Sequence, residues 1–166
     1  MKIRQWALAA TLGLCAATSA WANDYKAGQV EIDDLWVRAT APGQANGAGY
    51  MEIDNDAKTA DRLVSVTSSA AERVELHTVQ TENGVARMRH LPDGIPVPAD
   101  GEVKLAPGGY HVMFLKLKQP FTEGAEVPAT LKFEKAGEVA VKFKVKPIGH
   151  NPGMQHGMQH GMDMKH

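Results

Sequence analysis

The chain has 166 residues, of which 22% are charged, and a formal net charge of −1 at pH 7. This near-neutral balance, without any block of basic residues, argues against a nucleic acid or a membrane surface as partner. With a single cysteine, the chain cannot form an internal disulfide bond or a Cys-x-x-Cys redox site.

Residues 1–22 have the pattern of a secretory signal. Lys2 and Arg4 give a positive start, an apolar stretch follows, and Ala20-Trp21-Ala22 offers small residues at a cleavage site. We therefore expect cleavage after Ala22 and an exported protein. The signal carries two basic residues and no acidic one, so 16 basic and 19 acidic residues remain, a net charge of −3.

The only cysteine, Cys15, lies inside this signal, so the mature chain is expected to contain no thiol. Leu14 is large where a lipoprotein cleavage site before Cys15 requires a small residue, which argues against lipidation. The apolar stretch is too short to span a bilayer, and no later segment resembles one. We expect no membrane insertion.

Beyond the signal, short segments alternate apolar and polar residues with the two-residue period of β-strands, and no helical stripe extends over three turns. Turn residues such as Asn83-Gly84 separate the segments. Eight or nine short strands predict an all-β fold, a β-sandwich with Greek-key connections. The predicted strands lie at 30–37, 48–53, 63–66, 74–77, 103–105, 110–117, 129–133 and 139–145.

The composition changes near Pro147, which divides a folded domain at 23–147 from a tail at 148–166. The tail repeats Gly-Met-Gln-His at 153–156 and 157–160 and has little to bury, so we expect it to be disordered until it binds something. Its metal-binding side chains would be His150, Met154, His156, Met158, His160, Met162, Met164 and His166.

Histidine and methionine together suggest a copper site. Imidazole nitrogen and thioether sulfur are the pair that favours Cu(I), whereas Mg²⁺ and Ca²⁺ need oxygen clusters that this sequence does not offer. The imidazoles of the tail could also take Cu(II), and its flexibility would raise the local copper concentration near the domain.

Within the domain, Asn83-Gly84 predicts a hairpin in which paired positions sum to 167. His77 then faces His90, and Met88 faces Val79, so that His77 and Met88 are diagonal neighbours on one face.

Another predicted strand carries His111 and Met113, which are two apart and therefore point to the same side. If the two segments come together, they form a site with two nitrogen and two sulfur ligands. The proposed ligands are His77, Met88, His111 and Met113.

Some details favour simpler interpretations. The hairpin register puts Arg87 and Arg89 beside Leu76, which a core face would not tolerate without a bulge or a longer loop. Met51 is expected to fill the core, as methionine commonly does. His90 is expected at the surface, although its position opposite His77 keeps it as an auxiliary ligand candidate, with Met51 as a weaker one.

The spacing of these residues resembles that of the PCuAC family of periplasmic copper chaperones. The family pattern is His, ten residues, Met, about twenty-one residues, then His-x-Met. Here ten residues separate His77 from Met88, and twenty-two separate Met88 from His111-Val112-Met113. Thr78 stands where some members carry a further methionine. The resemblance covers 32–145 and includes the stretches at 36–39, 48–51, 75–77, 83–85, 94–99 and 105–113.

The resemblance implies a cupredoxin-like β-sandwich that binds one Cu(I) through the four proposed ligands. It also implies delivery of copper to cytochrome c oxidase, either to subunit II or through a Sco-type protein, and a tail that binds additional copper, including Cu(II). We expect a monomeric carrier, not an enzyme.

Three other functions are alternatives to a copper carrier. A blue-copper electron carrier needs a cysteine thiolate, which the mature chain lacks. A copper enzyme with an N-terminal histidine ligand is excluded because cleavage would expose Asn23, and a second site of several histidines is hard to build from so few. A copper-sequestering protein would use the same ligands, and the residues alone do not separate it from a chaperone.

Overall fold

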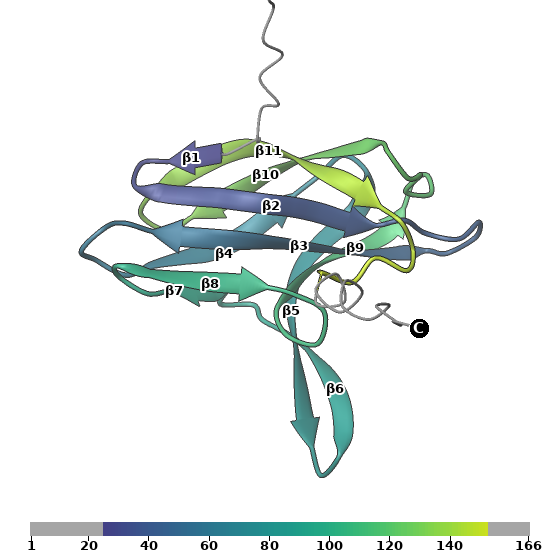
Figure 1. Cartoon of the computed structure of the whole chain (residues 1–166), viewed down its shortest axis with the longest axis horizontal. Helices are drawn as coiled ribbons and strands as arrows, with labels where there is room; N and C mark the ends of the chain where they lie inside the picture. The colour runs from purple at the N-terminus through teal and green to yellow at the C-terminus, as the bar shows by residue number, and fades with distance from the viewer. Residues whose placement is uncertain (1–24, 153–166) are drawn as a thin grey trace, which may run out of the picture.

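The computed structural model describes residues 25–152, and within this range the chain is all β (Figure 1). The described part contains no helix able to cross a membrane. The predicted signal, with Cys15, and the tail from residue 153 onward lie outside the described residues. The eleven strands are β1 (Tyr25–Ala27), β2 (Val30–Arg38), β3 (Asn46–Asn55), β4 (Asp61–Thr67), β5 (Ala71–Glu82), β6 (Val85–His90), β7 (Ile95–Val97), β8 (Gly101–Leu105), β9 (His111–Leu117), β10 (Glu126–Phe133) and β11 (Gly137–Lys146).

The strands are hydrogen-bonded in the order β6-β5-β9-β3-β2-β11-β10-β4-β7, while β1 pairs with β2 and β8 with β3. Only the pair of β2 and β11 is parallel among the described strand pairs. Phe114 on β9 packs edge-on against Phe143 on β11, with ring centroids 5.9 Å apart, although two strands separate β9 from β11 along the sheet. The sheet therefore folds over on itself and encloses one core, which confirms the predicted sandwich.

The alternation seen in the sequence decides which side chains enter this core. Along β10, Val127, Leu131 and Phe133 are buried and their neighbours face solvent. Gly49 on β3 lies where the core is closely packed. A Cβ atom there would lie 3.0 Å from the ring of Phe114, so a side chain would force its neighbours to shift.

A buried carboxylate ties β4 to the turn between β10 and β11. Asp61 accepts hydrogen bonds from the backbone N–H groups of Arg62 (2.7 Å), Lys135 (2.9 Å) and Ala136 (2.9 Å). Burial opposes its ionisation, but these three donors outweigh burial and hold the pKa of Asp61 below its ordinary value.

The hairpin of β5 and β6 has the predicted register, with His77 opposite His90 and Val79 opposite Met88. Asn83 and Gly84 both have positive φ (53° and 78°), as the tight two-residue turn requires. The hairpin extends away from the body of the sandwich (Figure 1).

This extension corrects one expectation. No bulge or longer loop is needed, because all six residues of β6 are exposed and the strand has no core face. Arg87 and Arg89 form ion pairs with Glu82 at the surface.

Candidate functional site

One face of the sheet carries a row of rings, one from each of five neighbouring strands: β6, β5, β9, β3 and β2. Successive ring centroids are 5.5 Å apart from His90 to His77, 5.7 Å to His111, 6.5 Å to Tyr50 and 4.4 Å to Trp36. Strand pairing produces this row, since His77 is directly opposite both His90 and His111, and Trp36 is opposite Tyr50. The two distant segments that carry the proposed ligands therefore lie side by side.

One ring nitrogen of His77 forms a hydrogen bond, and the other has no partner among the described residues. Its Nε2 lies 2.8 Å from Oε2 of Glu75. The hydrogen bond from His77 is the largest influence on the pKa of Glu75, and together with the charge of Arg73 it lowers that pKa despite burial. An ionised carboxylate only accepts, so Nε2 of His77 carries the proton. Nδ1 is buried and finds no hydrogen-bond partner in the described structure.

His111 shows the complementary arrangement. Its Nδ1 donates to the carbonyl oxygen of Gly109 at 3.2 Å, and its Nε2 is buried without a partner in the described part of the chain. The residue is only 4% exposed. Burial lowers the pKa of His111, an effect to which the nearby charge of His77 adds and which the Gly109 carbonyl opposes. The ring is therefore neutral near pH 7, with a lone pair on Nε2.

The two methionines line a cavity beside these rings. Met113 is on the face of β9 that carries His111, directly opposite Glu75 on β5. Met88 comes from the projecting hairpin and is 54% exposed. Met88, His111, Met113 and Tyr50 all border one open cavity of about 400 Å³.

The rings of His77 and His111 have the spacing of two imidazoles that share one metal ion. A metal about 2 Å from a nitrogen of each imidazole would place the two ring centroids about 5–6 Å apart, and the rings of His77 and His111 are 5.7 Å apart. Among residues 25–152, no group of three or more His, Cys, Asp or Glu side chains is arranged to hold a metal. Two imidazoles with thioether sulfur form a donor set suited to Cu(I).

The auxiliary candidates differ in their placement. Met51 is 1% exposed and packs in the core among residues such as Ile53, away from the row of rings. His90 is exposed but lies beside His77 at the end of the row.

The beginning of the predicted tail rests on the same face. The ring of His150 stands edge-on to Trp36, with centroids 4.8 Å apart, and its carbonyl accepts a hydrogen bond of 3.3 Å from Nη2 of Arg38. His150 thus lies at the far end of the row from His90. The other predicted tail ligands are outside the described residues, namely Met154, His156, Met158, His160, Met162, Met164 and His166.

The sequence did not reveal the role of Glu75 beside His77, or that Trp36 and Tyr50 belong to the row of rings. Glu75 is two residues before His77, and this spacing on a strand was the available signal for a shared face. Trp36 and Tyr50 were noted only as part of a family resemblance. Their alternation with the core residues Val37 and Met51 could have placed them on the opposite face of the sheet.

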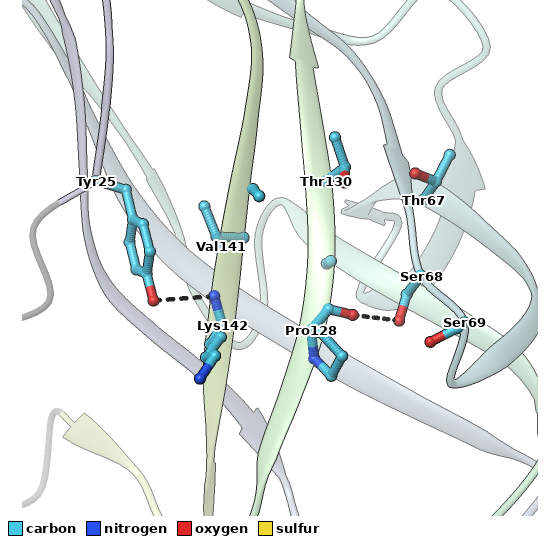
Figure 2. Close-up of a pocket in the computed structure, with 10 residues that line it drawn as sticks. Tyr25, Thr67, Ser68, Ser69, Pro128, Thr130, Val141 and Lys142 are labelled. Atoms are coloured by element: carbon cyan, nitrogen blue, oxygen red, sulfur yellow. Dashed lines mark hydrogen bonds between the residues drawn. The ribbon is translucent and has the colours of Figure 1, made fainter.

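A separate cavity of about 550 Å³ lies between β1, β4, β10 and β11 (Figure 2). Two hydrogen bonds join residues of its lining: the hydroxyl of Ser68 donates to the carbonyl of Pro128 at 2.6 Å, and the backbone N–H of Lys142 donates to the Tyr25 hydroxyl at 3.1 Å. Among residues 25–152, no histidine or methionine lines this cavity, so it is distinct from the row of rings.

Comparison with solved structures defines the class of domain. The copper-bound PCuAC domain from PmoF2 is 31% identical to this chain, covers 75% of it and 97% of that domain, and superposes with a TM-score of 0.64. The solution structure of Cu(I)-DR1885 from Deinococcus radiodurans is 31% identical with a TM-score of 0.56, covering 68% of this chain and 74% of that one. The described fold is that of a PCuAC domain.

Sequence comparison gives the family. Residues 30–145 match the family model described as "Putative lipoprotein LpqE-like". The protein named "Putative lipoprotein Lxx21020", from Leifsonia xyli subsp. xyli, is 34% identical over 117 residues, which is 70% of this chain and 69% of that protein. The chain belongs to the LpqE-like family of PCuAC proteins.

Proposed function

We propose that this chain is an exported copper carrier that binds one Cu(I) through His77, Met88, His111 and Met113. The observation that carries the proposal is a pair of buried ring nitrogens with no hydrogen-bond partner among residues 25–152. Their rings are 5.7 Å apart, beside a cavity that both methionines line. The PmoF2 domain and DR1885 have both been solved with copper bound, which supports the choice of metal.

The ligand set suits a protein that must hold copper and then release it. Both histidines are neutral as ligands and thioethers carry no charge, so the site keeps the single charge of the ion. His111 is buried, whereas Met88 is exposed, so an incoming ligand reaches the copper from the side of Met88. Thiolate ligands on an acceptor bind Cu(I) more strongly than thioethers and would draw it away.

We propose cytochrome c oxidase as the destination, either its subunit II or a Sco-type protein that serves it. The partner assignment rests on the family resemblance of the ligand pattern. No step of chemistry beyond ligand exchange is needed, so the protein acts as a carrier and not as an enzyme.

The tail is proposed to capture additional copper, with Cu(II) bound by imidazoles and Cu(I) by sulfurs. His150, anchored against Trp36, starts the tail near the end of the row of rings. A short tether from this point would keep captured ions at a high local concentration near the domain.

For the location, we propose the periplasm, after cleavage following Ala22. The relatives named lipoproteins support export. A monomer suffices, because one chain supplies all four ligands.

A second candidate is copper sequestration without a delivery partner, which the same ligands would serve. Deleting the gene distinguishes the two functions. Loss of a delivery protein should lower the copper content and activity of the oxidase and leave the copper tolerance of the cell unchanged, and loss of a sequestering protein should not give this result.

The direct test is a competitive Cu(I) titration of a chain that ends at residue 152, followed by X-ray absorption to count neighbours. We expect one tightly bound copper with two nitrogen and two sulfur neighbours. A variant with all four ligands replaced by alanine should lose this binding. Retained one-to-one binding of unchanged affinity in that variant would refute the assignment.

A further inference from the structure

We propose that Glu75 is a positioning residue that holds the ring of His77, so that copper is bound by Nδ1 of His77 and Nε2 of His111. The inference deepens the proposed Cu(I) site and rests on it. It assigns a role to a side chain that is not itself a ligand, and it specifies which nitrogen of each ring faces the ion.

The carboxylate of Glu75 is held by both of its oxygens. Oε1 lies 2.7 Å from Nε of Arg73, and Oε2 lies 2.8 Å from Nε2 of His77. The three residues alternate along β5, at 73, 75 and 77, and therefore project from the same face of the strand. The side chains of Glu75 and His77 are only 18% and 13% exposed, so water competes weakly for these contacts.

This arrangement leaves a single nitrogen of His77 for the metal. A ring whose Nε2–H is bound to a carboxylate can offer only Nδ1 as a ligand, and that atom is the one buried without a partner. In His111 the carbonyl of Gly109 occupies Nδ1 and leaves Nε2. Metal-binding histidines are typically fixed in this way, by a carboxylate or a carbonyl on the other nitrogen.

Glu75 also places a negative charge next to a site whose proposed ligands are all neutral. It is directly opposite Met113 on β9, one row along the face from the pair of His77 and His111. A cuprous ion bound by neutral ligands keeps its full positive charge. The carboxylate of Glu75, beside the ligands on the same face, would offset part of that charge. The same carboxylate raises the basicity of His77 as a ligand.

The test uses the mature full-length chain with ¹⁵N-labelled histidine and Cu(I) itself as the probe. In the apo protein, we expect the NMR signals of His77 to show a protonated Nε2 with slow hydrogen exchange. After loading with Cu(I), the metal-induced shift should appear at Nδ1 of His77 and at Nε2 of His111.

Three variants separate positioning from general stability. Glu75→Ala should lose the slowly exchanging Nε2–H and weaken Cu(I) binding at His77 about 10- to 100-fold. Glu75→Gln should keep the protonated Nε2, because its amide oxygen still accepts, and should weaken binding less. Glu72→Gln is the matched control: Glu72 is on the same strand, is exposed and pairs with Lys116, so no change at His77 is expected.

Two results would overturn the inference: a metal-induced shift at Nε2 of His77 in the wild-type protein, or a Glu75→Ala variant that binds Cu(I) within twofold of wild type. If wild-type His77 shows no copper-induced shift at all, the proposed Cu(I) site fails, and with it this role of Glu75. Wild-type binding with an unaffected Glu75→Ala variant would reject only the role of Glu75.

Discussion

His77 on β5 and His111 on β9 are directly opposite each other in an antiparallel pair of strands. In each ring, one nitrogen is buried and has no hydrogen-bond partner in the described part of the chain. Their separation is therefore fixed by backbone hydrogen bonds and not by the side chains alone. A metal ion that binds both rings would find its nitrogen ligands already at the right spacing. The loss of conformational entropy on binding is therefore smaller than for ligands that must first be brought together.

Replacing Met113 by leucine tests whether sulfur, and not volume, is what the site uses. Met113→Leu preserves size and hydrophobicity, so we expect a change in stability of less than about 1.5 kcal/mol and a loss of tight Cu(I) binding in a chelator competition. Met51→Leu is the control, because Met51 is buried in the core. Equal copper affinity in both variants would remove Met113 from the ligand set.

Removing residues 153–166 tests which copper ions the domain binds and which ones the tail binds. We expect the number of copper ions bound per chain to fall while one tight Cu(I) site remains, because the four domain ligands are all kept. Metal analysis after dialysis against a weak chelator gives the stoichiometry. A truncated chain that binds no copper would place the tight site in the tail instead.

The contact of His150 with Trp36 can be followed by fluorescence. The chain has three tryptophans, Trp6, Trp21 and Trp36, so after the expected cleavage Trp36 is the only one left. Because the imidazole centroid of His150 lies 4.8 Å from the ring centroid of Trp36, we expect His150→Ala to increase the emission of Trp36. His90→Ala, at the opposite end of the row, should leave it unchanged, and identical spectra for wild type and His150→Ala would contradict the contact.

Asp61 is expected to make stability depend on pH in the acidic range. Its folded-state pKa is lowered, so the folded protein prefers the ionised form. The stabilisation is fully present above the unfolded-state pKa of about 3.9 and is lost as the pH falls through the lower folded-state value. Urea unfolding between pH 2 and 6, read by circular dichroism, should show this decline.

The matching substitution removes the same interaction at neutral pH. Asp61→Asn leaves one of three buried N–H donors facing an amide NH₂ group, so we expect a loss of about 1.5–3 kcal/mol in the free energy of unfolding. Asp100→Asn breaks only an exposed ion pair with Lys58 and should cost less than about 1 kcal/mol. A wild-type pH profile for Asp61→Asn would show that the carboxylate is not the group responsible.

The alternation of apolar and polar residues was sufficient to predict most of the strands, because it follows from one face of a strand being buried and the other facing solvent. It failed for β1 and β7, which have three residues each and are too short to show a period. It also failed to place β6, since a strand exposed on both faces carries no alternation in burial. The turn chemistry of Asn83 and Gly84 nevertheless set the correct register of that hairpin.

For the site, local reasoning placed each pair of ligands on one face but could not bring the pairs together. The pairing of β5 with β9 joins segments far apart in the sequence, and nothing in either segment specifies the other. The role of Glu75 was hidden for a related reason: a glutamate in an alternating strand looks like an ordinary solvent-facing residue until its neighbours across the sheet are known.

The position of β6 at the edge of the sheet has a mechanical consequence. Met88 belongs to a two-stranded ribbon whose outer strand pairs only with β5 among the described strands, while the other three ligands are on strands paired on both sides. Bending this ribbon outward would withdraw the sulfur of Met88 from a copper ion at the proposed site and would leave the core intact. Release of copper from the proposed site would then require no unfolding of the domain, and a copper acceptor would need to displace only this hairpin.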